Sequence, residues 1–126
     1  MMTEQKKLTA VLGASTNPTR YAYLAAERLH QHGHPIKLVS IKKGELFGEP
    51  FQDLRQKPGI KGIDTVTLYI GSDNLSEWQD YILSLHPNRI IFNPGTENPE
   101  LSKAAQAQGI ETIEACTLVM LGTGQF

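Results

Sequence analysis

The chain has 126 residues, which is enough for one domain with an ordinary hydrophobic core and too few for a second domain that would enclose a cleft. Its 12 lysine and arginine residues against 13 acidic residues give a formal net charge of -1, and without a long basic run to follow a phosphate backbone no nucleic-acid partner is expected. The single cysteine, Cys116, rules out an internal disulfide, and the lack of a secretory leader or a membrane-length apolar segment predicts a cytoplasmic protein with no membrane partner.

Apolar runs with strand character alternate with amphipathic runs of helical periodicity. Residues 8–13 (LTAVLG) predict the first strand. A helix is then expected to begin at Asn17-Pro18, because asparagine caps helices and proline suits the first helical position. This helix should end near Gly33, and residues 35–41 (PIKLVSI) predict the second strand.

The pattern is weak between residues 42 and 64, where a turn, a short edge strand at 49–51 and a loop at 56–62 are predicted. Regular structure resumes with a strand at 65–70, a helix from Asn74 or Leu75, and a strand at 89–92. Asn98-Pro99 gives a second cap signal and opens a third helix, which leads to a strand at 110–115. The apolar tail, residues 116–126, is expected to pack back on the domain or on another subunit.

Together these elements predict a mostly parallel α/β sheet of six strands within one domain, residues 1–126. The familiar doubly wound order is 3-2-1-4-5-6, with helices on both faces in a three-layer α/β/α sandwich. The switch point of that order lies between the first and fourth strands. Residues 13–17, 70–73 and 93–96 would meet there in one crevice, and Ile70 and Gly71 would belong to its wall.

The first of these segments suits an anion. Gly13, Ala14 and Ser15 follow a strand and lead into a helix N-terminus, where unpaired backbone N–H groups and the helix dipole attract negative charge. A phosphate or pyrophosphate is the expected ligand, with contacts from Ser15 and Asn17 and a clamp from the planar guanidinium of Arg20. The alternative is that Gly13 only turns the chain, Asn17 only caps the helix and Arg20 is solvated.

The end of the second strand, VSIKKG, lacks the acidic residue that binds ribose hydroxyls in nicotinamide dinucleotide sites. Lys42 and Lys43 would instead attract another phosphate, unless they are ordinary surface charges. Across the crevice, Asn93, Pro94 and Gly95 follow a strand directly. They either line a ligand or form the turn that the next helix requires.

No catalytic residue and no metal site are predicted. The histidines at positions 30, 32 and 34 crowd one helix end, but the helical twist spreads them apart, and histidine is favourable there in any case. Cys116 follows a strand, where a nucleophile would reach the crevice, although a lone thiol is more often buried and inert. Trp78 is expected to pack against the sheet, with Glu77 on a solvated face.

Three stretches carry a family resemblance: the first strand with its helix and second strand (AVLGASTNPTRYAYLAAERLHQHGHPIKLVSI), the turn GELFGEPF, and NPGTENPELSKAAQAQGIETIEACTLVML. They resemble the small stand-alone CoA-binding domain proteins, which are similar to the nucleotide-binding lobe of the succinyl-CoA synthetase α subunit. The resemblance covers nearly the whole chain and implies a Rossmann-like domain that binds coenzyme A. By matching motif it implies a site at Gly13, Ala14, Ser15, Asn17, Arg20, Tyr21, Ser40, Lys42, Asn93, Pro94 and Gly95.

The chain departs from that family's pattern at two places: Ser40-Ile41 replaces a common Asn-Pro pair, and the strand TLYIGSDN lacks the Val-Phe-Arg pattern of many relatives. No histidine matches the phosphorylated histidine of the ligase, so the resemblance implies binding of CoA or a CoA thioester without catalysis. Two alternatives remain open. One is an enzyme, either of the NAD(P) type or transferring acyl groups through Cys116. The other is an assembly module with a vestigial site, in which the apolar tail forms a homodimer.

Overall fold

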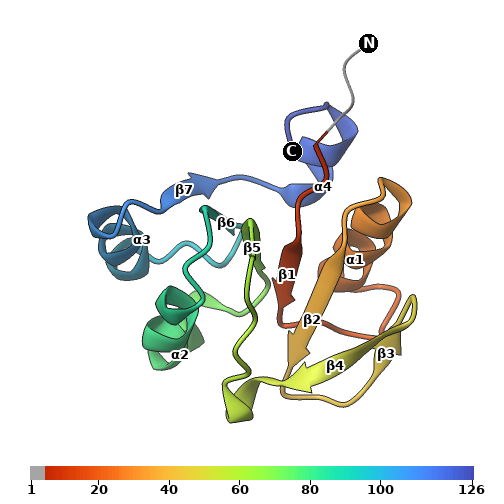
Figure 1. Ribbon diagram of the computed structural model, residues 1–126, viewed down its shortest axis with the longest axis horizontal. Coiled ribbons are helices and arrows are strands. Elements are labelled where there is room, and N and C mark those ends of the chain that lie inside the picture. The colour runs from red at the N-terminus through yellow and green to blue at the C-terminus, as the bar shows by residue number, and fades with distance from the viewer. Residues whose placement is uncertain (1–4) are drawn as a thin grey trace.

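A computed structural model describes residues 5–126 and shows a central sheet of seven strands with helices on both of its faces (Figure 1). The strand order across the sheet is β3-β4-β2-β1-β5-β6-β7. The strands are β1 (Thr9–Leu12), β2 (Ile36–Ser40), β3 (Glu45–Leu46), β4 (Glu49–Asp53), β5 (Thr65–Leu68), β6 (Arg89–Phe92) and β7 (Glu111–Glu114). The helices are α1 (Tyr21–Gln31), the short 3-10 helix η1 (Leu54–Gln56), α2 (Ser72–Ser84), α3 (Pro99–Ala107) and α4 (Thr117–Gly122).

The predicted Rossmann-like class is confirmed, with one correction to the strand order. All six predicted strands pair in parallel and in the predicted sequence, but β3 adds an antiparallel strand beside β4. Only two residue pairs join β3 to β4, and the turn between them uses a positive φ at Phe47 and at Gly48. A strand of two residues is too short to produce a periodic pattern, so the sequence does not reveal it.

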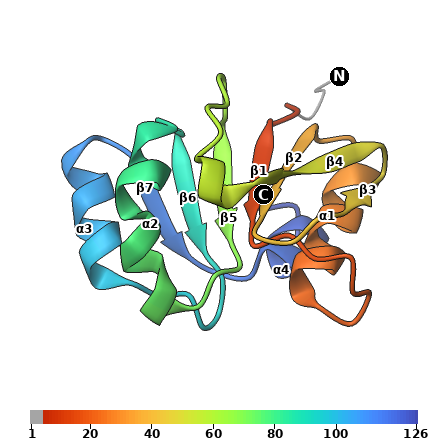
Figure 2. The same ribbon diagram turned by 90° about the horizontal axis from the view of Figure 1, so that it is seen from below.

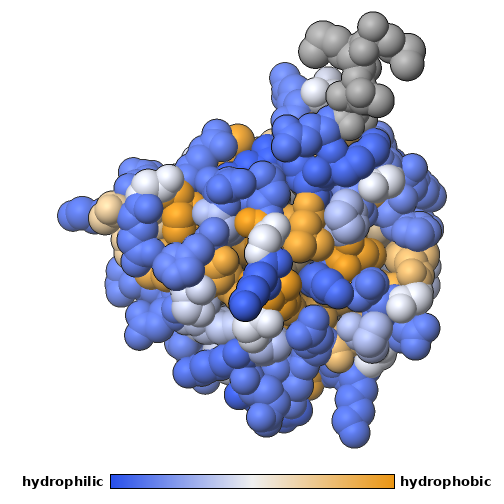
Figure 3. Space-filling model, viewed as in Figure 1, coloured by the Kyte–Doolittle hydropathy of each residue, from blue (hydrophilic) through white to orange (hydrophobic). Residues whose placement is uncertain are grey.

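The helices form two layers, as Figure 2 shows: α1 and α4 cover one face of the sheet, and α2 and α3 cover the other. Along β1 the side chains alternate between the two layers, with Val11 packed toward α1 and with Ala10 and Leu12 packed toward α2 and α3. The described chain from β2 to β5 has no α-helix, only the 3-10 helix η1, and loop residues Ile60 and Ile63 pack on the core on the α2 side of the sheet. Hydrophobic residues gather in the middle of the face seen in Figure 3, within a hydrophilic rim.

The start of α1 differs from the prediction. The Asn17 side chain accepts a hydrogen bond from the Thr19 amide at 3.0 Å, and its carbonyl accepts one from the Arg20 amide at 3.0 Å, so Asn17 closes a turn and does not cap the helix. The helix begins at Tyr21, with Arg20 at the cap position. Residues 13–20 are therefore a loop, and this loop lies at the carboxyl end of β1.

At the second cap signal the prediction is confirmed. The Asn98 side chain accepts a hydrogen bond from the Leu101 amide at 2.9 Å, and Pro99 is the first residue of α3. Asn98→Ala is therefore expected to lower the free energy of unfolding by about 1 kcal/mol. Asn17→Ala is the matched control, because the same substitution beside a proline removes no helix cap; its loss should stay below about 0.5 kcal/mol. Urea unfolding of both variants measures the difference, and equal losses would contradict the assignment of the two caps.

The tail adopts the first of its two predicted placements, since it packs against α1 of the same chain. Met120 and Leu121 of α4 are buried, and so is Phe126, whose ring lies 4.4 Å from the Arg89 guanidinium and 4.9 Å from the His34 ring. These three residues of the tail thus contribute to the core beneath α1, whereas Val119 of α4 is 59% exposed. Among residues 5–126, no helix is both long and apolar enough to span a bilayer.

Candidate functional site

A cleft of about 570 Å³, the main cleft, opens where β1, β2, β4 and β5 end. This edge of the sheet includes the switch point between β1 and β5, from which the connections run to opposite faces. Three groups of residues line the main cleft: Gly13, Ala14, Ser15, Arg20, Tyr21 and Ala22 from the first loop and α1; Ser40, Ile41, Lys42 and Leu54 after β2 and β4; Tyr69, Ile70, Gly71, Asn74, Glu77 and Trp78 after β5 and along α2.

Gly13 makes the tight turn that brings the first loop into the main cleft. Its φ is +95°, and a Cβ atom at this position would lie 2.7 Å from the carbonyl oxygen of Tyr69. The amides of Gly13 and Ala14 both donate to the carbonyl of Val39, at 2.9 and 3.2 Å. These two amides are therefore engaged with the sheet, and an anion held by this loop would bind from Ser15 onward.

Ser15, Arg20 and Tyr21 complete the loop's side of the cleft. The Ser15 hydroxyl accepts a hydrogen bond from the Asn17 amide at 3.1 Å, so it shapes the loop as well as facing the cleft. Arg20 is exposed, makes no side-chain cap to α1, and lines the cleft together with Tyr21. Asn17 lies outside the lining, because its side chain is turned to Thr19.

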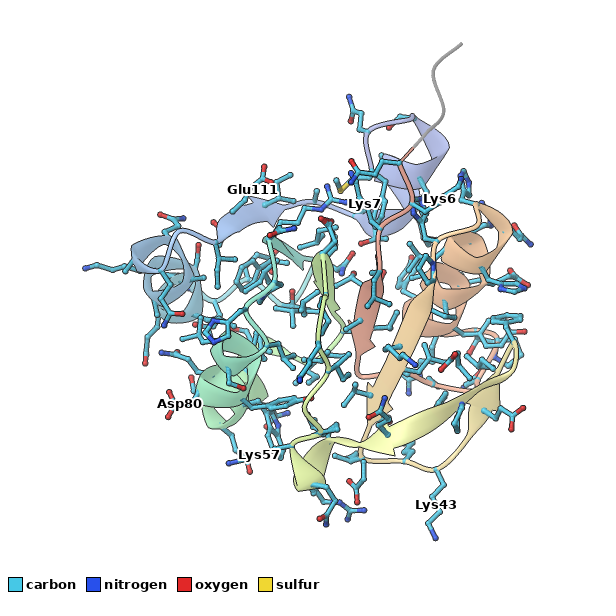
Figure 4. All side chains as sticks on the ribbon, viewed as in Figure 1. Lys6, Lys7, Lys43, Lys57, Asp80 and Glu111 are labelled. Atoms are coloured by element: carbon cyan, nitrogen blue, oxygen red, sulfur yellow. The ribbon has the colours of Figure 1, made fainter. Side chains whose placement is uncertain are left out.

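The two adjacent lysines have different positions. Ser40 is buried, and its hydroxyl accepts a hydrogen bond from the Lys42 amide at 3.0 Å, which turns the chain after β2. This turn places Lys42 in the wall of the main cleft. Lys43 lies outside the lining, and Figure 4 shows its side chain projecting outward from the molecule. Of the pair predicted to attract a phosphate, only Lys42 therefore faces the cleft.

The opposite wall contains residues that the sequence interpretation missed as a group. Asn74, Glu77 and Trp78 share one face of α2 at i, i+3 and i+4 spacing and line the cleft beside the predicted Ile70 and Gly71. Helix α2 begins at Ser72, two residues before the predicted start, so its first two turns reach the switch point. Trp78 packs on the core, as expected, and also borders the cleft. The sequence contained one indication of this wall: the aromatic residue Trp78 lies two turns into the helix after β5.

A second hollow of about 190 Å³, the side pocket, adjoins the main cleft. Its lining consists of Tyr21, Tyr69, Asn93, Pro94 and Cys116, so it shares both tyrosines with the main cleft. The predicted third segment of the crevice is thus divided: Asn93 and Pro94 line the side pocket. The next residue of that segment, a glycine, lines neither hollow.

Asn93, directly after β6, connects β5 and α4 beneath the side pocket. Its side-chain amide donates to the Thr67 hydroxyl at 2.7 Å and to the Leu68 carbonyl at 2.9 Å, and its side-chain oxygen accepts from the Thr117 amide at 2.9 Å. The residue is 2% exposed. All of its hydrogen-bonding groups toward β5 and α4 are in use, so Asn93 forms the turn and the pocket floor and has no free amide proton for a ligand.

Among the described residues, Cys116 and the histidines form no hydrogen-bonded catalytic arrangement. Within residues 5–126 the Cys116 thiol makes no hydrogen bond to a histidine or a carboxylate. His30 stacks on Phe47 at 5.0 Å, away from the cleft, and His34 accepts a hydrogen bond from the Lys7 amide at 3.0 Å. In the same part of the chain no three side chains of metal-ligating type form a group. Burial raises the pKa of Tyr69 to about 12, which keeps its hydroxyl neutral.

Several solved structures share this architecture. A crystal structure of an uncharacterized protein is 51% identical with a TM-score of 0.93, and the match covers 98% of this chain and 100% of that one. Cell-free ID.343 from Thermus thermophilus is 26% identical with a TM-score of 0.80, over 96% of this chain and 91% of that one. A hypothetical protein from Pyrococcus horikoshii OT3 is 24% identical with a TM-score of 0.81, over 94% and 84%. No curated protein matches the chain.

The family model described as a CoA binding domain matches residues 7–122, which include every strand and helix from β1 to α4. The main cleft, with its loop after β1 and its basic residues, lies wholly inside that match. The chain belongs to the CoA binding domain family.

Proposed function

We propose that the protein binds coenzyme A or a CoA thioester in the main cleft and holds this ligand without transforming it. The observation that carries the proposal is the pair of cations in the cleft wall: Arg20 lines it on the loop after β1, and Lys42 lines it after β2. CoA carries a pyrophosphate and a separate 3′-phosphate, and two cations on different elements of one cleft suit two separated phosphate groups.

In this arrangement the pyrophosphate lies between Ser15, the first turn of α1 and Arg20. The helix has no side-chain cap, so its first amides and its dipole favour an anion there. The 3′-phosphate lies at Lys42. Glu77 faces the same cleft from α2 and repels phosphate, so the α2 wall receives uncharged parts of the ligand, with the ring of Trp78 offering an aromatic surface.

Titration calorimetry with CoA, dephospho-CoA, NAD and NADP at one salt concentration tests the proposal. We expect CoA to bind about tenfold more tightly than dephospho-CoA, because one charge-assisted hydrogen bond contributes on the order of 1.5 kcal/mol. Lys42→Ala should remove this difference. Lys43→Ala is the matched control, and it should bind CoA like the parent because Lys43 projects away from the cleft.

Arg20→Ala provides a second arm of the same experiment. Since Arg20 is assigned to the pyrophosphate, its loss should weaken CoA and dephospho-CoA by the same factor, about tenfold. A preference for NAD or NADP over CoA would favour the nucleotide-dependent enzyme. Equal effects of the two lysine substitutions would show that the 3′-phosphate is bound elsewhere.

The assembly alternative has less support, because Met120, Leu121 and Phe126 of the tail are buried against α1. A homodimer and a cytoplasmic location stay predictions from the sequence. Acyl transfer through Cys116 likewise stays a prediction, and mass spectrometry after incubation with an acyl-CoA would reveal an adduct on that cysteine.

A further inference from the structure

The side pocket is continuous in its walls with the main cleft, since Tyr21 and Tyr69 line both hollows. We propose that the side pocket is an acyl chamber, which receives the short, uncharged acyl group of a CoA thioester whose nucleotide lies in the main cleft. This inference rests on the proposed function and narrows its ligand from CoA in general to a class of thioesters.

The strand order supports the direction in which the ligand runs. Lys42 follows β2, on one side of β1, whereas Asn93 follows β6 and Cys116 follows β7, on the other side of β1 and β5. The loop after β1 lies between them. A CoA molecule with its 3′-phosphate at Lys42 and its pyrophosphate at this loop therefore extends its pantetheine arm toward β6 and β7. The thioester end of that arm reaches the side pocket.

The chemistry of the pocket lining favours an apolar occupant. Pro94 has no backbone N–H, and the side-chain amide of Asn93 is fully used by Thr67 and Leu68. The Tyr69 hydroxyl is enclosed by protein, so this residue offers its ring to the pocket. What remains is two aromatic rings, a prolyl ring and the half-buried Cys116 thiol. A carboxylate placed there would lose its hydration, and no residue of the lining carries a positive charge to compensate for that loss.

The size of the pocket sets an upper limit on the chain. Its volume is about 190 Å³, and a cavity of roughly 150 Å³ in another protein holds a benzene molecule. An acyl group of roughly four to six carbons therefore fills the space. Longer acyl chains would extend past Tyr21, which is 70% exposed at the rim, into solvent. Their additional carbons would not be buried and would add no binding free energy.

Calorimetric titration with CoA, acetyl-CoA, butyryl-CoA, succinyl-CoA and palmitoyl-CoA tests the chamber. Each buried methylene strengthens binding about fourfold, and butyryl has two more methylenes than acetyl, so butyryl-CoA should bind about fifteenfold more tightly than acetyl-CoA. Palmitoyl-CoA should bind no better than butyryl-CoA. Succinyl-CoA, whose acyl group has the same carbon number as butyryl but ends in a carboxylate in place of the methyl group, should bind at least about tenfold more weakly than butyryl-CoA.

Two substitutions at Cys116 test whether the preference for butyryl-CoA arises in the side pocket. Cys116→Leu fills the pocket and should abolish the preference for butyryl-CoA over CoA, while binding of free CoA is retained and shows that the variant is folded. Cys116→Ala leaves the space open and should keep the preference, which separates loss of volume from loss of the thiol.

Two outcomes overturn the inference alone: CoA binds but butyryl-CoA binds no more tightly than acetyl-CoA, or Cys116→Leu keeps the full preference. In either case the nucleotide site in the main cleft stands without an acyl chamber. If the parent protein binds no CoA compound in this series, the proposed function fails and the acyl chamber fails with it.

Discussion

Replacement of Gly13 by alanine is expected to lower the free energy of unfolding by about 3 kcal/mol. A left-handed conformation costs an L residue with a side chain roughly 1–2 kcal/mol, and Gly13 has a φ of +95°. The added Cβ would also lie 2.7 Å from the Tyr69 carbonyl oxygen and 2.9 Å from its carbonyl carbon. These are backbone atoms, so the first loop and the end of β5 must move apart, at a further cost.

Gly95→Ala is the matched control for this prediction. Gly95 has a φ of +91°, and a Cβ atom there would meet nothing within 4 Å. Its substitution carries the conformational cost alone, about 1–2 kcal/mol. Urea unfolding with unchanged m values measures both losses. A Gly13 variant no less stable than the Gly95 variant would disprove the close approach of β1 and β5 as the reason for glycine.

Asn93→Ala is expected to cost about 3 kcal/mol as well, for a different reason. The substitution leaves the Thr117 amide and the Leu68 carbonyl buried without their partners, and each orphaned group costs on the order of 1–3 kcal/mol. Thr117 is fully buried, so water cannot replace the lost side chain without rearrangement.

The same substitution at Asn74 provides the comparison. Asn74 is exposed on α2 and lines the main cleft, so Asn74→Ala should change the free energy of unfolding by less than about 0.5 kcal/mol. Thermal or urea unfolding ranks the two variants. If Asn93→Ala unfolds like the parent but loses CoA affinity, Asn93 is a ligand contact and the structural role assigned to it is wrong.

The strong apolar runs of the sequence were sufficient to predict the sheet. The strand β5 is buried throughout and β2 is buried except at the half-buried Lys37, and both appear within one or two residues of the predicted bounds. Their order also follows from the alternation of strands and helices, because each parallel connection needs a crossover on one face. The strand order in turn predicts the position of the main cleft, because the cleft lies at the switch point of that order.

Local cap chemistry was not sufficient, as the two Asn-Pro pairs show. Asn98 reaches the amide three residues ahead and caps α3, whereas Asn17 reaches the amide two residues ahead and closes a turn. The difference arises from tertiary structure: the Val39 carbonyl holds the amides of Gly13 and Ala14, and this fixes the direction of the loop that follows.

The division of the crevice into the main cleft and the side pocket could not be predicted from the sequence either. Lys42 and Lys43 have the same chemistry, and only the turn made by the Ser40 hydroxyl decides which of them faces the cleft. Similarly, Cys116 joins Tyr21 in one pocket because β7 lies beside β6, a proximity between residues far apart in the chain. Such contacts depend on the assembled sheet and leave no local pattern.

The two edges of the sheet restrict how copies of this protein can associate. At one edge β3 offers only two residues for pairing. At the other edge β7 begins with Glu111 and ends with Glu114, both exposed. A twofold antiparallel pairing of two β7 strands would set Glu111 of each copy opposite Glu114 of the other, and like charges directly opposite are destabilising. Continuation of the sheet from one molecule into the next is therefore disfavoured, which leaves the helical layers and the loops as the surfaces for contact between copies.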